Sequence, residues 1–212
     1  AFRDTKLTSI VIPDGCEEIG AECFALCEKL KDIYVPGSVY SIGNDAFYTF
    51  NDATVIHTEK YSAAENTAKE NGIKVDYKSA PTASTSSTKA NSKKTSSVDE
   101  ASGLAVTGTK VSKNDCEIDY LDTLTAYNGS AKAIILPDGI SAIGEGAFSS
   151  NDNLTSVVIP EGVETIEVGA FWMCENLKSV ILPSTIRRIG DIAFRDTKLT
   201  SIVIPDGCEE LG

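Results

Sequence analysis

The stretch LTSVVIPEGVETIEVGAF, residues 154–171, decides the fold of this chain because short apolar patterns lie on both sides of one proline. The first half predicts a short strand, in which successive side chains point to opposite faces. Pro160 ends that strand because proline has no N–H to donate to a neighbouring strand. Val158 is expected to face outward, and the residues expected to face inward are Leu154, Val157, Ile159, Val163, Ile166 and Phe171.

The same unit recurs along the chain with an almost constant period. The prolines that mark it form a first pair and a second group of four: Pro13, Pro36, Pro137, Pro160, Pro183 and Pro205. In each complete copy a phenylalanine follows the proline at one fixed distance, at Phe24, Phe47, Phe148, Phe171 and Phe194. A single coil cannot bury its own apolar face, so the coils must stack with their strands parallel. The sequence therefore predicts a β-rich repeat solenoid with 23-residue coils.

The copies share the motif I-P-x-x-V-x-x-I-G-x-x-A-F, and Cys27 and Cys174 each lie three residues after the phenylalanine. In this motif the chain resembles the BspA-like leucine-rich repeat family of bacterial and protozoan surface proteins. Departures are small: Glu167 replaces a glycine, Cys23 replaces an alanine, and Cys16 and Cys208 stand in the valine slot. The resemblance implies a leucine-rich repeat fold and a place on the cell surface or outside the cell.

A different pattern follows Phe47 and is expected to close the solenoid. Thr58 or Ser62 can cap a helix, and Asn71-Gly72 can end it. Ala64 and Ala68 share one helix face, and a strand follows through Ile73, Val75 and Tyr77. Residues 54–78 resemble the C-terminal cap of the family.

The segment CEIDYLDTLTAYNGSAKAIILP, residues 116–137, resembles the hairpin that opens such a solenoid. Ile118, Leu124 and Tyr127 are expected to face the first coil. We therefore expect a hairpin N-cap and a helix–strand C-cap.

Three segments follow from these assignments. Residues 1–78 form a repeat half with the C-terminal cap, and residues 108–212 form the N-terminal cap with the other repeat half. Between them, serine and threonine fill almost half of the positions 79–107 and aromatic residues are absent, so a flexible linker is expected.

Residues 1–20 match residues 193–212 at 19 of 20 positions, which indicates a duplicated cassette. We read the chain as a window cut from an array of such cassettes, or as a permutation. Each half then has one open coil face, and the two faces are complementary. We expect self-association by end-on stacking, within one chain or between chains, through Leu7, Ile10, Ile12, Leu199, Ile202 and Ile204.

Composition argues against several classes of function. The net charge of −12 disfavours nucleic acid and anionic membranes as partners, and no apolar run is long enough to predict membrane insertion. The single histidine, His57, has no evident orienting partner, and we interpret it as a residue that packs at the surface or against the cap. The six cysteines fill apolar slots, so we expect buried thiols rather than a zinc site at Cys23 and Cys27. We expect no catalytic residues, no metal and no cofactor.

Two outward columns of strand residues are the candidate binding face. One column is apolar or aromatic: Val11, Tyr34, Ile135, Val158, Ile181 and Val203. The other column is small or polar: Ser9, Asp32, Ser156, Ser179 and Ser201. Such a pattern follows from strand propensity alone, or it marks a recognition surface for an extended ligand.

The family resemblance favours a non-enzymatic, adhesin-like module that binds a protein or glycan, host or matrix components included. Two alternatives remain open. The solenoid is a structural spacer or self-assembling cassette, which the duplicated segments favour, or it is a targeting module attached to an enzyme beyond these residues.

Overall fold

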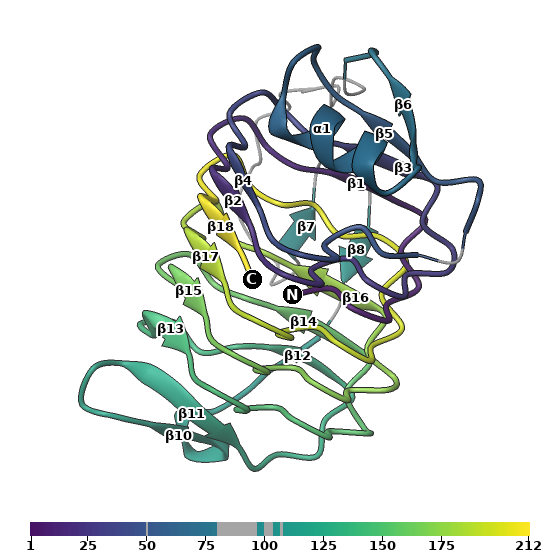
Figure 1. Ribbon diagram of the computed structural model, residues 1–212. Coiled ribbons are helices and arrows are strands. Elements are labelled where there is room, and N and C mark those ends of the chain that lie inside the picture. Colours follow the sequence, from purple (N-terminus) through teal and green to yellow (C-terminus); the bar gives the residue numbers. More distant parts are fainter. Residues whose placement is uncertain (50, 80–96, 100–103, 107) are drawn as a thin grey trace.

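The computed structural model describes residues 1–49, 51–79, 97–99, 104–106 and 108–212. Its coils stack into a solenoid with two walls, and most coils contribute one strand to each wall (Figure 1). The expected fold class, a solenoid of parallel strands with one repeat unit in each coil, is confirmed.

The first wall carries the strands that precede the prolines. In the C-terminal half its sheet has the order β16-β14-β12-β9 and parallel pairing throughout. The strands are β9 (Thr109–Lys110), β12 (Ala133–Ile135), β14 (Ser156–Val158) and β16 (Ser179–Ile181). In the N-terminal half the sheet is β1-β3-β5-β6, formed by β1 (Ser9–Val11), β3 (Asp32–Tyr34), β5 (Val55–His57) and β6 (Lys74–Asp76).

The second wall is one eight-stranded sheet that runs through both halves, in the order β10-β11-β13-β15-β17-β18-β2-β4. Its C-terminal-half members are β10 (Cys116–Ile118), β11 (Thr123–Tyr127), β13 (Ala142–Ile143), β15 (Thr165–Ile166), β17 (Arg188–Ile189) and β18 (Glu210–Leu211). The N-terminal half adds β2 (Glu18–Ile19) and β4 (Ser41–Ile42). Strands of both halves contribute to this one sheet. The division of the chain into two halves, residues 1–78 and 108–212, therefore stays a prediction.

Between the walls, the inward residues of all coils form one hydrophobic core. The phenylalanines expected from the repeat spacing stack in a column, with Phe148, Phe171 and Phe194 at ring-centroid distances of 4.8 and 5.3 Å. Phe2 continues the column at 5.5 Å from Phe194 and 5.6 Å from Phe24. Parallel rings at these distances bury large apolar surfaces, so each coil is held against the next.

The N-terminal cap is the expected antiparallel hairpin of β10 and β11, preceded by the short 3-10 helix η1 (Lys113–Asp115). Leu124 is fully buried and Tyr127 is 9% exposed, so both cover the first coil as the sequence indicated. The strand β9 beside β12 was not expected from the sequence.

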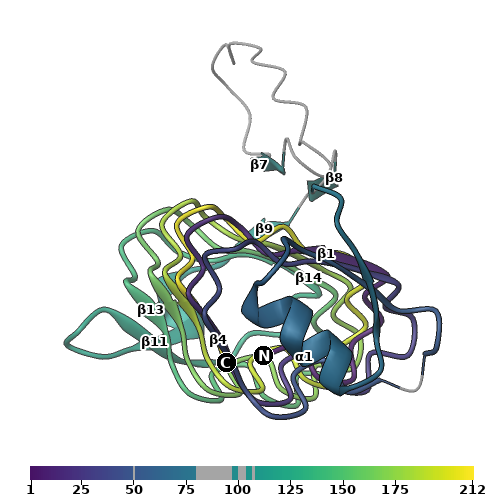
Figure 2. The same cartoon turned by 45° about the horizontal axis from the view of Figure 1, so that its top comes forward.

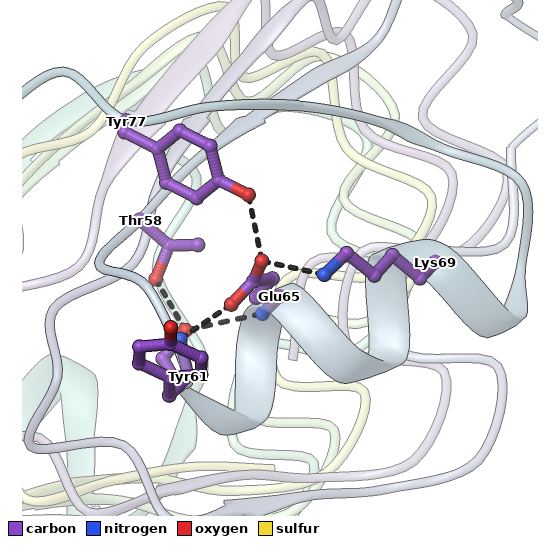
Figure 3. A network of polar contacts seen from close by, with 6 residues as sticks. Thr58, Tyr61, Glu65, Lys69 and Tyr77 are labelled. Carbon is purple, nitrogen blue, oxygen red and sulfur yellow. Dashed lines mark hydrogen bonds and ion pairs between the residues drawn. The ribbon is translucent and has the colours of Figure 1, made fainter.

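The C-terminal cap is closed by α1 (Ala63–Glu70) and β6. Ser62 is the N-cap, and its hydroxyl accepts a hydrogen bond from the Glu65 backbone N–H at 3.1 Å. The Glu65 carboxylate accepts hydrogen bonds from Lys69 Nζ and the Tyr77 hydroxyl, each at 2.6 Å, and from the backbone N–H of Tyr61 (Figure 3). These bonds fix the helix against the strand segment that follows it.

Part of the expected linker is ordered as a hairpin. Strands β7 (Ser97–Asp99) and β8 (Leu104–Val106) pair antiparallel. Figure 2 shows both strands outside the stacked coils, on the side of β9, and β8 contacts β14. These six residues of the expected linker form paired strands, and the flexible linker over residues 79–107 stays a prediction. The other positions of 79–107, apart from Ser79, lie outside the described residues.

Candidate binding surface

The outer strand face is defined here as the outward side chains of the first wall, on β1, β3, β5 and β6 and on β12, β14 and β16. Parallel pairing without a register shift places equivalent residues of successive coils side by side. Val11 pairs with Tyr34 and Tyr34 with His57, while Val158 pairs with Ile181. The two columns expected from the sequence therefore exist as rows of neighbouring side chains within each sheet.

Exposure varies along these columns. The positions next to the chain ends are open to solvent, with Val11 39% and Val203 43% exposed. Ser9 and Ser201 are exposed as well. The half-buried members are Asp32, Tyr34, Ile135, Ser156, Ser179 and Ile181.

Val158 does not fit the expectation of an exposed column, since only 5% of it is accessible. It lies outside the hydrophobic core cluster that contains its neighbours Val157 and Ile159. Because β8 contacts β14, the linker hairpin lies over this part of the wall. The outer strand face is therefore covered at Val158, whereas Val11 on β1 is exposed and Asp32 and Tyr34 on β3 are half-buried.

An aromatic and acidic group extends the face toward the C-terminal cap. The rings of Tyr34 and His57 stack at 4.2 Å with an interplanar angle of 12°. His57 Nε2 lies 2.9 Å from Asp32 Oδ1, and His57 Nδ1 lies 3.7 Å from Asp76 Oδ2. We call Asp32, Tyr34, His57 and Asp76 the histidine cluster.

His57 is the enclosed member of this cluster, and Lys78 lies next to Asp76. His57 is 7% exposed and its Nδ1 has no hydrogen-bond partner. Lys78 Nζ, 2.8 Å from Asp76 Oδ2, lowers the pKa of the Asp76 carboxyl, and His57 adds to this effect.

His57 and Asp76 are the next members of the Val11–Tyr34 column, a role that was not predicted for them. A signal was present in the sequence: Ile56 is fully buried in the slot that Ile33 fills in the previous coil. Aligning Ile56 with Ile33 would have placed His57 beside Tyr34.

The cysteines lie in the core, away from the outer strand face. All six are buried and unpaired. Burial raises the pKa of the Cys16 and Cys174 thiols to about 11 and that of Cys208 to about 12. These thiols are therefore neutral near pH 7 and pack as small apolar side chains.

Neither a metal-binding group nor a membrane-spanning helix occurs among the described residues. No group of three or more histidine, cysteine or acidic side chains there is arranged to hold a metal ion. No helix in the part of the chain that the structure describes has the length and apolarity needed to cross a bilayer.

The six residues expected at the open coil faces are all buried. Leu7 and Leu199 are inaccessible, and the others, Ile10, Ile12, Ile202 and Ile204, are 2 to 9% exposed. Lys6 N–H donates to the carbonyl oxygen of Leu199 at 2.9 Å, so the two faces lie against each other.

Several solved structures are similar to this chain. The pneumococcal vaccine antigen PcpA is 17% identical with a TM-score of 0.42, and 97% of this chain aligns with 47% of that one. A leucine rich cell surface protein from Faecalibacterium prausnitzii is 19% identical with a TM-score of 0.34, over 96% and 43%. A leucine-rich repeat protein from Bacteroides ovatus is 18% identical with a TM-score of 0.32, over 96% and 52%. The chain thus spans about half the length of each.

No curated protein matches this sequence. The family model described as "BspA type Leucine rich repeat region" matches six copies, over residues 1–97 and 119–212. These ranges contain every proline-marked coil and the helix α1 of the C-terminal cap. The chain belongs to the BspA-type leucine-rich repeat family.

Proposed function

We propose that this chain is a non-enzymatic binding module of a cell-surface or secreted protein, and that its outer strand face contacts a protein or glycan ligand. Membership in the BspA-type family supports the surface location. The observation that carries the binding role is the histidine cluster, which continues directly from exposed Val11.

The chemistry of this face suits an extended ligand. Val11 and the half-buried ring of Tyr34, which stacks on His57, offer apolar and aromatic surface, and such surface dominates the energy of many interfaces. The carboxylate of Asp32, whose side chain is 44% exposed, and that of Asp76 can accept hydrogen bonds from sugar hydroxyls or peptide N–H groups. Successive coils present such groups at strand spacing, so a linear ligand can contact several coils at once.

A comparison of two matched variants tests this proposal. The probes are a glycan array and a set of purified extracellular-matrix proteins, measured by biolayer interferometry on the immobilised chain. The double variant Val11→Ser, Tyr34→Ser should lose at least tenfold in affinity for the probe that the unmodified chain binds. Tyr40→Ser is the control, since Tyr40 is 65% exposed but lies beside the second wall.

Thermal unfolding of each variant separates lost binding from lost folding. A folded double variant with weakened binding, together with a control that binds normally, supports the proposal. Equal binding by both variants, or no binding of any probe by the unmodified chain, contradicts it.

A further inference from the structure

His57 lies within the outer strand face of the N-terminal half, but little of its side chain reaches solvent. Strand β5 places it directly beside Tyr34 of β3 and directly beside Asp76 of β6. The His57 side chain is 7% exposed, whereas the side chains of Asp32 and Asp76 are 44% and 32% exposed. A ligand on this face therefore meets the neighbours of His57 rather than His57 itself.

The backbone around His57 is held on both sides. The His57 carbonyl oxygen accepts a hydrogen bond from the Val35 N–H at 2.9 Å, and the Thr58 N–H donates to the Asp76 carbonyl oxygen at 3.1 Å. The preceding residue, Ile56, is fully buried in the core. Because β5 cannot turn without exposing Ile56, the imidazole is a fixed point in the sheet.

The imidazole holds two neighbours by different means. Nε2 of His57 lies 2.9 Å from Asp32 Oδ1, and an ionised carboxylate only accepts hydrogen bonds, so Nε2 carries the proton and donates it. The Tyr34 ring stacks on the imidazole with the ring centroids 4.2 Å apart. Asp32 and Tyr34 are groups that the outer strand face offers to a ligand. Side chains that are ordered before binding lose less conformational entropy when the ligand arrives.

The second ring nitrogen has no such role. In the neutral imidazole with its proton on Nε2, Nδ1 is an acceptor, and it faces the Asp76 carboxylate, also an acceptor, at 3.7 Å. No hydrogen-bond partner of Nδ1 occurs among the described residues. Lys78 Nζ lies 2.8 Å from the same Asp76 oxygen and offsets part of its charge. One nitrogen of His57 is thus committed to Asp32, and the other is committed to no neighbour.

We propose that His57 is the positioning residue of the outer strand face. It does not touch the ligand; it fixes the Asp32 carboxylate and the Tyr34 ring in the arrangement that the ligand binds. Its effect on affinity rests on the function proposed above, whereas the arrangement itself exists in the ligand-free protein. The two contacts are separable, because the hydrogen bond needs the Nε2–H donor and the stack needs a flat ring.

The ligand-free protein gives the first test. His57 is the one histidine of the chain, so its ring nitrogens give a single pair of signals in a two-bond proton–nitrogen correlation spectrum. Near neutral pH the spectrum should show the tautomer with the proton on Nε2, and that proton should exchange slowly with solvent. Asp32→Ala should mix the two tautomers, whereas the control Asp152→Ala, which removes an exposed carboxylate in the other half, should change nothing. A mixture of tautomers in the unmodified chain overturns the proposal.

Substitutions at His57 give the second test, with the matrix-protein or glycan probe that the unmodified chain binds. His57→Gln keeps an N–H donor for Asp32, and His57→Phe keeps a flat ring against Tyr34. Each should weaken binding about threefold, whereas His57→Ala should weaken it about tenfold.

Relaxation measurements on a labelled Tyr34 ring, made without ligand, separate positioning from a general loss of folding. The ring should become more mobile in His57→Ala and His57→Gln but not in His57→Phe, while thermal unfolding shows that all three variants are folded. A folded His57→Ala with an immobile Tyr34 ring, or with unchanged affinity for the probe, overturns the proposal. If the unmodified chain binds no probe, the proposed function fails, and the tautomer and the ring mobility alone decide whether His57 positions its neighbours.

Discussion

The junction between the coils of β14 and β16 differs in one instructive way from the junction of residues 199–212 with residues 1–20, which we call the seam. At the first, core stacking, strand pairing and chain connection all support the same register. At the seam, the phenylalanine column and the β18–β2 pairing continue, but residues 201–204 form no strand on the first wall. Burial of apolar side chains is thus enough to align the two coils at the seam, although hydrogen bonding between strands is incomplete on the first wall at that junction.

The largest expected difference between the two junctions comes from removing one ring at each. Phe171 and Phe2 are both inaccessible to solvent. Phe171→Ala should lower the free energy of unfolding by about 3–5 kcal/mol, the usual cost of such a cavity. Phe2→Ala should open the seam, so the two halves unfold in separate steps. Urea unfolding followed by circular dichroism should show one transition for Phe171→Ala and two for Phe2→Ala. One transition in both variants would mean that the seam is as strong as any other junction.

A smaller effect should follow from reversing one charge at the seam. Glu18→Arg places a cation opposite Glu210 and repeats the pairing that Arg188 makes on the other side of that residue. We expect the free energy of unfolding to rise by about 0.5–1 kcal/mol at low salt, and the gain to disappear at high salt.

Ser41→Arg is the control for this charge reversal, because Ser41 pairs with Glu18 away from the seam. It adds a similar ion pair at an ordinary junction. An equal change in both variants, measured by urea unfolding at two salt concentrations, would show that repulsion across the seam contributes nothing special.

The smallest effect should be confined to the C-terminal cap, the closed end with which the seam contrasts. Hydrogen bonds from Lys69, Tyr77 and the Tyr61 backbone lower the pKa of Glu65 from 4.5 to about 2. Because the folded pKa lies below the unfolded value, this stabilisation is complete above pH 4.5 and is lost as the pH falls toward 2.

Hydrogen exchange of the α1 amides between pH 4.5 and 2, corrected for intrinsic rates, measures this loss. Amide protection in α1 should fall across this range in the unmodified chain, whereas Glu65→Gln should give protection that is low and nearly constant. Protection that falls equally in both proteins would assign the acid sensitivity to another group.

Parts of the candidate binding surface followed directly from residue spacing. The alternation around Val157 placed Ser156 and Val158 on the face opposite to Val157, and the constant repeat period placed equivalent residues side by side. Burial of Val158 did not follow, because it depends on contact between β8 and β14, which are far apart in sequence. The histidine cluster was also missed, since His57 joins Tyr34 only when the cap strand β5 takes the register of β3.

The sequence by itself determined the coil: its strand, its turn after proline, its inward phenylalanine and the need for caps. These features are local, because side-chain direction and proline geometry act within one repeat. Only the tertiary structure decided which coil faces meet and which outward residues stay exposed. Glu18 and Glu210 are neighbours despite lying near opposite ends of the chain, and Val11 stays open while Val158 is covered. These outcomes depend on contacts between segments that lie far apart in the chain. The free energies of such contacts cannot be read from the pattern of one repeat.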